Sequence, residues 1–271
     1  MHGRSRLVVA AGAAVVFALV LGFVATAAIA PPPNIASAGK IVFCSDLGYP
    51  PMESLQGSRP VGADVDIGSA IAKSMAVEAR FENVGFDGII AALLAKKCDA
   101  VISGMTDTVA RRKQVDFIDY LSVGMSLMVK KGNPRHITGL ASLSGLRVAV
   151  QVGTTEKDAL AAENKLLAER HRELVVVKFF NRDSDAAAAL VTGKVDAYFS
   201  DDPPVGYYVK ESSGRFAVAV AKIQAAPYGI ATRKHDPLGA AIRGAIAQLN
   251  ANGTMKAILA EWGLGALAFT G

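Results

Sequence analysis

Two patterns of hydrophobic and polar residues alternate along this chain, one typical of strands and the other typical of helices. Short apolar runs predict buried strands, whereas apolar residues spaced three and four apart predict helices. The predicted strands are 40–45, 99–103, 147–152, 174–180 and 196–200. The predicted helices begin at or near Asp66, Asp87, Thr108, Glu156, Asp185, Leu238 and Thr254. This alternation predicts an α/β fold in which helices cover sheets that contain parallel strands.

Two longer extended runs, 121–130 and 216–232, interrupt the alternation. We interpret them as two crossings between lobes. Residues 40–127 and 228–271 then form lobe 1, and residues 128–227 form lobe 2. The prediction is therefore two mixed sheets, each flanked by helices, joined by two hinge strands. Ligands favour such an interdomain cleft.

The N-terminus predicts export. Residues 7–24 are apolar and follow a short basic region, and Ala25-Thr26-Ala27 and Ala36-Ser37-Ala38 both fit a signal-peptidase site. The alternative is an uncleaved anchor, because the apolar run approaches the roughly 18 residues that can span a bilayer. Residues 1–38 are thus a signal peptide or anchor, with Pro31–Pro33 as a spacer. The expected location is periplasmic or extracellular.

Charge and cysteine content narrow the function classes. The 271 residues include 29 basic and 24 acidic ones, a net charge of +5 with no basic cluster, which gives no case for nucleic acid. Export permits a disulfide between Cys44 and Cys98, but both lie in or beside apolar runs. We therefore interpret them as buried small hydrophobic residues. No metal-binding spacing is present, and no cofactor is expected.

Eight short motifs occur in order along the chain. They are Asp46–Glu53 (DLGYPPME), Gly62–Asp66 (GADVD), Phe86–Ile90 (FDGII), Asp99–Thr106 (DAVISGMT), Thr108–Arg111 (TVAR), Val115–Phe117 (VDF), Gln151–Thr155 (QVGTT) and Gly193–Ala197 (GKVDA). From residue 40 to residue 263, the sequence resembles the bacterial extracellular solute-binding proteins of family 3, the soluble components of ABC importers for polar amino acids. The resemblance implies a type II periplasmic-binding-protein fold, a monomer that closes on a free amino acid and docks onto a membrane permease.

A free amino acid is a zwitterion, so a specific site needs a cation for its carboxylate. Arg111 offers a bidentate guanidinium fork, although it lies in a run of three basic residues that could simply face water. The resemblance favours the ligand role, because the family places its arginine five residues after a small hydroxyl residue, here Thr106. Arg112 is then expected to face solvent. Gly104 stands where relatives often carry serine, so only backbone contacts are expected there.

The second lobe offers a helix N-terminus and an acid. Thr155 lies between a strand and a helix, where backbone N–H groups attract anions, so we expect it to contact the ligand carboxylate. A plain helix cap is the other interpretation. Asp201 follows a strand at its carboxyl end and is the candidate for the ligand ammonium. Its neighbour Asp202 leaves the assignment open from spacing alone, and the resemblance favours Asp201.

Tyr49 and Phe86 are the candidate aromatic walls, since exposed rings hold planar cations by cation–π attraction. Core packing is the alternative for both rings. Asp46, at the carboxyl end of the first strand, would meet the far end of the ligand side chain. Together these residues predict a basic amino acid ahead of glutamine.

An enzyme on the same fold is the alternative function. Cyclohexadienyl and arogenate dehydratases resemble these binding proteins, and their chemistry calls for a general acid in the cleft. Glu53 and Glu156 are the acids available, and neither comes with a second catalytic group. We therefore predict no catalytic residues.

Overall fold

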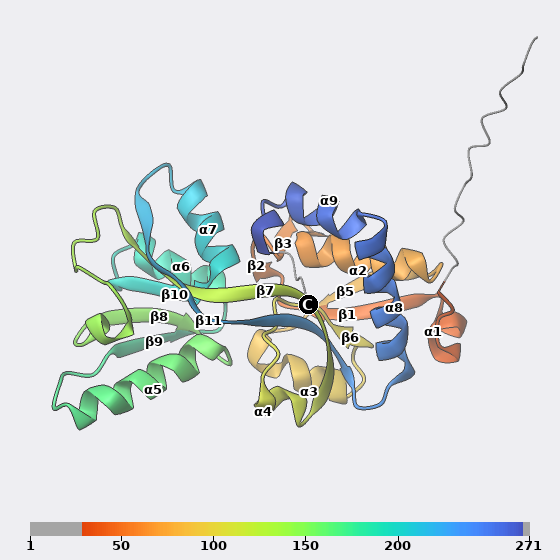
Figure 1. The fold of residues 1–271 in the computed structure, drawn as a ribbon, viewed down its shortest axis with the longest axis horizontal. Helices are drawn as coiled ribbons and strands as arrows, with labels where there is room; N and C mark the ends of the chain where they lie inside the picture. The colour runs from red at the N-terminus through yellow and green to blue at the C-terminus, as the bar shows by residue number, and fades with distance from the viewer. Residues whose placement is uncertain (1–28, 268–271) are drawn as a thin grey trace, which may run out of the picture.

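The computed structural model describes residues 29–267 (Figure 1). The strands are β1 (Lys40–Ser45), β2 (Gly48–Tyr49), β3 (Glu53–Gln56), β4 (Arg59–Val61), β5 (Glu78–Asn83), β6 (Ala100–Val101), β7 (Val115–Lys130), β8 (Arg147–Gln151), β9 (Val176–Phe180), β10 (Ala197–Asp201) and β11 (Phe216–Arg233). The α-helices are α1 (Pro33–Ala38), α2 (Ala63–Ser74), α3 (Ile89–Leu94), α4 (Val109–Arg112), α5 (Thr155–Glu169), α6 (Asp183–Val191), α7 (Asp202–Glu211), α8 (Pro237–Ala251) and α9 (Thr254–Glu261). The 3-10 turns are η1 (Phe86–Gly88), η2 (Leu140–Leu143) and η3 (Gly265–Leu267).

The predicted α/β architecture is confirmed, with one refinement. The two expected mixed sheets share their central strands and form one ladder in the order β5-β1-β6-β11-β7-β10-β8-β9. Strands β7 and β11 pair antiparallel along almost their whole length and run from one group of helices to the other (Figure 1). A small antiparallel sheet of β2, β3 and β4 lies beside them.

The hydrophobic core divides along these two long strands. The buried clusters on one side contain residues up to Val123 and from Tyr228 onward, while those on the other side contain residues from Met125 to Ile223. The pairing of β7 with β11 shifts register several times between Val218 and Ala226, where the chain passes from one core to the other. Each core therefore packs independently, and only the two strands are common to both.

Several element bounds differ from the sequence-based expectations. Helix α2 begins at Ala63 rather than Asp66, because the backbone N–H of Asp66 already donates to the carbonyl oxygen of Gly62. The N–H groups of Ala63 and Asp64, which precede this first helical bond, donate to the carbonyl oxygens of residues 51 and 52. The runs 216–223 and 228–232 form the single strand β11. Helix α7, which begins immediately after Asp201, has two prolines in its first turn, and these obscured it in the sequence.

The segment before β1 is folded, not a spacer. Pro33 opens helix α1, and Ile35 is buried in the same core as Ile41 and Ile71. The backbone N–H of Ile29 also bonds to the Ser74 carbonyl oxygen at the end of α2. The expected signal sequence and its Ala25-Thr26-Ala27 site lie outside the described residues. Within residues 29–267, no helix has the length and apolar character needed to cross a bilayer.

Cys44 and Cys98 form a disulfide, so their interpretation as unpaired hydrophobic residues was wrong. Both are buried as expected. Cys44 lies on β1, and Cys98 precedes β6, the parallel neighbour of β1. Pairing of adjacent strands brings the two Cα atoms to 5.7 Å, a distance that a disulfide spans, and the strand register cannot be read from the cysteine spacing alone.

Candidate functional site

All eight predicted site residues line one cavity between the two cores. The predicted residues on its wall are Asp46, Tyr49, Phe86, Gly104, Thr106, Arg111, Thr155 and Asp201. It is also lined by Glu53, Ser103, Gln151, Thr154 and Glu156. The fold brings these lining residues together because many of them follow the carboxyl ends of parallel strands. Open α/β sheets present their ligand contacts at these ends.

Arg111 is held by the short helix α4 and by backbone oxygens. The Thr108 side chain caps α4 by accepting from the Arg111 backbone N–H over 3.2 Å. The guanidinium donates from Nη1 to the Thr106 carbonyl oxygen (2.6 Å) and from Nη2 to the Gly153 carbonyl oxygen (3.0 Å). It also lies 5.3 Å from the centre of the Phe86 ring. The second carbonyl comes from the loop before α5, so Arg111 reaches across the cavity.

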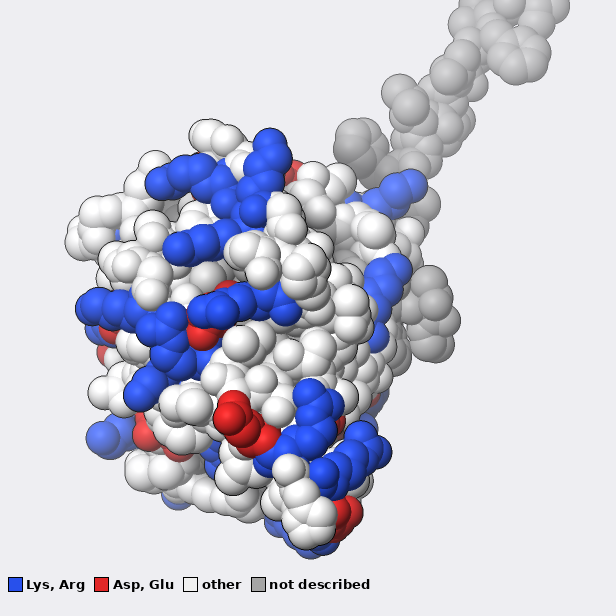
Figure 2. Space-filling model, turned by 90° about the vertical axis from the view of Figure 1, so that its left-hand side faces the viewer, with Lys and Arg blue, Asp and Glu red and all other residues white. Residues whose placement is uncertain are grey.

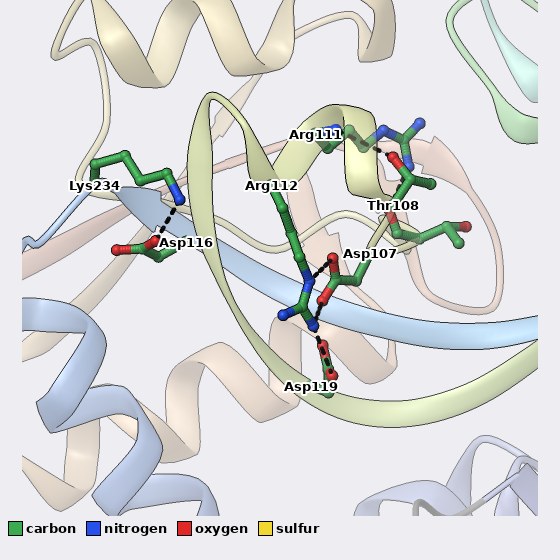
Figure 3. Close-up of polar contacts among 8 residues, drawn as sticks. Asp107, Thr108, Arg111, Arg112, Asp116, Asp119 and Lys234 are labelled. Carbon is green, nitrogen blue, oxygen red and sulfur yellow. Dashed lines mark hydrogen bonds and ion pairs between the residues drawn. The ribbon is translucent and has the colours of Figure 1, made fainter.

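Arg112 is exposed, as expected, but it also pairs with acids. Its guanidinium pairs with the Asp107 carboxylate through both Nε and Nη2, and Nη2 lies 3.7 Å from Asp119 Oδ2. Figure 3 shows Arg111 and Arg112 leaving α4 in different directions, with Arg112 pointing to the two acids. Arg112 is partly exposed, but it is not an unpaired surface charge.

Asp201 is held by two tyrosines. Its Oδ2 accepts hydrogen bonds from the hydroxyls of Tyr49 (2.8 Å) and Tyr228 (2.5 Å). Burial raises the pKa of the Asp201 carboxyl, and the two tyrosine hydroxyls lower it. The hydroxyl of Tyr49 is thus bonded to the acid on the opposite side of the cavity, so Tyr49 is both an aromatic wall and a polar contact.

Gly104 is required by the Tyr49 ring. Its φ is +47°, and a Cβ at this position would lie 2.7 Å from Cε1 of Tyr49 and 3.2 Å from Cε2 of Tyr228. The Gly104 N–H donates to Oδ2 of Asp64 over 2.7 Å. A larger residue therefore cannot stand here while Tyr49 keeps its place. This explains why a glycine occupies position 104.

Asp46 also reaches across the cavity. Its Oδ2 accepts from Nε2 of Gln151 (2.7 Å) and from the Phe86 backbone N–H (3.2 Å). The Ser103 hydroxyl accepts the Asp46 backbone N–H, which fixes the start of the loop. Burial raises the pKa of the Asp46 carboxyl, while the bond from Gln151 opposes that rise.

Two further acids lie behind the Ser103–Gly104 segment. Glu53 Oε1 accepts the Ser103 hydroxyl (2.7 Å), and Asp64 Oδ1 accepts the Tyr120 hydroxyl (2.7 Å). Both carboxyl groups are fully buried. Burial and the neighbouring Asp64 raise the pKa of Glu53 well above its usual value, and burial raises that of Asp64 to about 6. Glu53 and Asp64 thus hold Ser103 and Gly104 in place through hydrogen bonds.

Glu156 follows Thr155 in the first turn of α5 and is only 2% exposed. Its Oε1 has no hydrogen-bond partner among the described residues, and its Oε2 accepts from Oγ1 of Thr155 (3.3 Å). Burial, together with the nearby charge of Asp201, raises the pKa of Glu156 well above its usual value. Burial thus favours the protonated form of this carboxyl.

The cavity is acidic although the protein is basic. Asp46, Glu53, Glu156 and Asp201 line it, and the cation among the described lining residues is Arg111. Figure 2 shows the outer end of the half that contains β8, β9 and β10, where Lys and Arg side chains far outnumber acids. The basic charge thus lies on the surface, and the interior charge favours a cation.

Gln151 and Tyr228 are among the contributors to this site that were not predicted from the sequence. Gln151 belonged to a recognised motif, but its position as the last residue of β8 was its only signal. Tyr228 lies on β11 and bonds to Asp201 from 27 positions away. No local sequence pattern predicts a hydrogen bond between residues this far apart in the sequence. Among residues 29–267, no group of three or more His, Cys, Asp or Glu side chains could hold a metal ion.

The model of the bacterial extracellular solute-binding proteins, family 3, matches residues 41–265. This chain belongs to that family. The ABC transporter arginine-binding protein 1 of Escherichia coli K12 is 32% identical to this solute-binding protein over 235 residues, which cover 84% of the chain and 92% of that relative.

Two solved structures extend the comparison. An ancestral arginine-binding protein, solved with arginine and with glutamine bound, is 35% identical, has a TM-score of 0.75, and is matched over 83% of this chain and 98% of that one. An ancestral amino-acid-binding protein that is a precursor of cyclohexadienyl dehydratase is 31% identical, also with a TM-score of 0.75, over 84% and 97% of the two chains. This solute-binding protein therefore has the type II periplasmic-binding-protein fold.

Proposed function

We propose that this solute-binding protein captures a basic free amino acid, with L-arginine as the first candidate, and delivers it to the permease of an ABC importer. The observation that carries the proposal is the set of charges on the cavity wall: Asp46 and Asp201 lie there with Arg111, while burial raises the pKa values of Glu53 and Glu156 well above the usual value. A basic amino acid brings two cations and one carboxylate, which matches this set of charges. The arginine-binding relatives support the same ligand class.

Each end of the ligand has a partner of opposite charge. Arg111 and the N-terminus of α5 at Thr155 would bind the α-carboxylate, because a guanidinium fork and free helical N–H groups both favour anions. Asp201 would bind the α-ammonium. Asp46 would bind the distal cation of the side chain, with Phe86 beside it. The raised pKa of Glu156 reduces its repulsion of a ligand carboxylate.

We also propose that two lobes close on the ligand about β7 and β11, with lobe 1 formed by 40–127 and 228–271 and lobe 2 by 128–227. The contacts across the cavity support this: Arg111 bonds to Gly153, Tyr49 to Asp201, and Asp46 to Gln151. A ligand that adds contacts to both sides stabilises only the closed form. The protein would act as a monomer, since one chain supplies the whole proposed site.

The folded segment before β1 helps to distinguish between the two possible signal-peptidase sites. Cleavage at Ala36-Ser37-Ala38 would remove helix α1 and its buried Ile35, whereas cleavage at Ala25-Thr26-Ala27 would retain them. We propose that the exported protein keeps α1, either through cleavage at the earlier site or through an uncleaved anchor. N-terminal sequencing of the exported protein distinguishes these outcomes from cleavage at Ala38.

Dehydratase activity is the second candidate function. The observation that favours it is Glu156, a buried acid in the cavity with a raised pKa, as a general acid requires. Binding alone is the preferred function because the cavity charge suits a cation, whereas arogenate and prephenate each bring two carboxylates. Incubation with arogenate and with prephenate, followed by measurement of released carbon dioxide, tests the enzyme directly.

Ligand binding itself is tested by a thermal-shift screen of the twenty amino acids, followed by calorimetry. A ligand that binds only the folded protein raises its melting temperature by mass action. Arginine, lysine or histidine should give the largest shifts. Arg111→Ala should weaken binding by about 30- to 5000-fold, the range for loss of one partner of a buried charge pair. Tight binding of glutamate with no response to a basic amino acid would overturn the proposed specificity.

A further inference from the structure

Arg112 joins two acids from different elements of the fold. Its Nε donates to Asp107 Oδ1 over 2.7 Å, its Nη2 pairs with Asp107 Oδ2, and the same nitrogen lies 3.7 Å from Asp119 Oδ2 (Figure 3). The Asp107 side chain is only 1% exposed, whereas that of Arg112 is 59% exposed. The arginine thus supplies the cation for a carboxylate that water barely reaches.

Asp107 lies in the segment that orients Arg111. The residue before it, Thr106, accepts the Arg111 guanidinium through its carbonyl oxygen, and the residue after it, Thr108, caps helix α4. The backbone N–H of Asp107 donates to the Pro227 carbonyl oxygen on β11 over 2.9 Å. A shift of Asp107 therefore moves both groups that define the direction of the Arg111 fork.

Asp119 connects the same arginine to the crossing strands. It lies on β7 opposite Gly229 of β11, and its Oδ1 is buried with no partner among the described residues. Burial and the like charge of Asp107 raise the pKa of Asp119, while Arg112 and the more distant Arg243 lower it. Without Arg112, Asp107 and Asp119 would face each other with no cation between them.

We propose that Arg112 is a positioning residue for the ligand site: by bridging Asp107 and Asp119, it fixes the 106–108 segment to β7 and so sets the direction of the Arg111 fork. The ligand readout rests on the proposed function, because it uses L-arginine as the probe. The effect of Arg112 on the 106–108 segment can be measured separately, by hydrogen exchange of the ligand-free protein.

The first measurement is hydrogen exchange of the ligand-free protein. Arg112→Ala should speed exchange of the amides in residues 106–112, because the repelling acids loosen this segment. Lys113→Ala is the matched control, since it removes an exposed cation from the next position of the same run. Equal exchange in wild type and Arg112→Ala would overturn the proposal, whatever the ligand proves to be.

The second measurement is the L-arginine dissociation constant from calorimetry, at a temperature where every variant is fully folded. Arg112→Ala should raise it about tenfold, within the range of coupling between residues of one network, and Lys113→Ala less than about twofold. Adding Asp107→Asn to Arg112→Ala should recover part of the affinity, because it removes the uncompensated carboxylate. An unchanged dissociation constant in Arg112→Ala would also overturn the proposal.

Repeating Arg112→Ala in an Arg111→Lys background tests whether Arg112 acts by orienting Arg111 or only by stabilising the fold. A lysine has no fork to orient, so Arg112→Ala should cost clearly less affinity there than in the wild type. Equal costs in both backgrounds would show that Arg112 acts only on overall stability. Wild-type protein that binds no amino acid would instead count against the proposed function, and the hydrogen-exchange result would still decide the role of Arg112.

Discussion

Asp46 and Gln151 meet across the cavity, where Nε2 of Gln151 donates to Oδ2 of Asp46 over 2.7 Å. The same carboxylate oxygen also accepts the Phe86 N–H. Among the described residues, the hydrogen bonds to this carboxylate thus gather on Oδ2, which leaves Oδ1 for a ligand cation. The pair holds the acid that follows β1 in place when the two sides of the cavity meet.

Asp46→Asn should therefore change specificity rather than abolish binding. Hydrogen bonds to charged groups contribute about 1.5–3 kcal/mol, so arginine affinity should fall by about 10- to 150-fold. Glutamine should lose much less, because an amide can still bond to an asparagine. Calorimetry with both ligands on both proteins makes the comparison. Equal losses for arginine and glutamine would place the distal cation elsewhere.

Gly153→Ala should impair closure of the lobes. Gly153 has a φ of +77°, and a Cβ there would lie 2.9 Å from the Asp87 Cα on the opposite side of the cavity. The contact exists only when the two sides meet, whereas the backbone strain of about 1 kcal/mol acts in every form. Small-angle scattering with saturating ligand should show a larger radius of gyration than for wild type.

Gly132→Ala is the control for this variant, because Gly132 also has a positive φ (+81°) but no neighbouring atom within 4 Å of a built Cβ. It should lose a similar amount of stability and keep its affinity. If both variants bind as tightly as wild type, the Asp87 contact does not limit closure.

The free energy of unfolding should be largest at about pH 4 to 5. Burial raises the pKa of Asp183 to about 7 and that of Asp64 to about 6. Above about pH 4, the folded protein holds protons that the unfolded chain has lost, so stability falls as the pH rises toward 7. Asp196 acts oppositely: its bonds from Arg147 lower its pKa to about 2, and that contribution is lost below about pH 4.

Denaturant titrations from pH 3 to pH 8 measure this profile. Asp183→Asn should flatten the fall between pH 5 and pH 7, because the group that takes up the proton is gone. Stability that rises steadily from pH 5 to pH 8 would contradict the proposed protonation of these acids.

The disulfide should account for a substantial part of the stability. Its removal in Cys44→Ala/Cys98→Ala should lower the free energy of unfolding by about 2–5 kcal/mol. Dithiothreitol should produce a loss of similar size in the wild type and none in the double variant. Two titratable thiols in the untreated, denatured wild-type protein would show that the bond does not form.

Local pattern was enough to predict much of this protein. The alternation of strands and helices predicted the α/β class, and the position of Thr155 at a helix start made it a candidate. Spacing alone left Arg111 and Asp201 open, and the ordered motifs that resemble the family favoured them. Thr108 was also correctly expected at a helix start, and its side chain caps α4 from within the first turn.

Only the tertiary structure decided the partners of these residues. The Cys44–Cys98 bond depends on the pairing of β1 with β6, and the Tyr228–Asp201 bond on the path of β11 between two cores. Arg112 looked like a surface charge because Asp119 is on another element and Asp107 is buried only by packing. Hydrogen bonds and charge pairs depend on distance in space, and the sequence period specifies which face of an element is buried but not what lies against it.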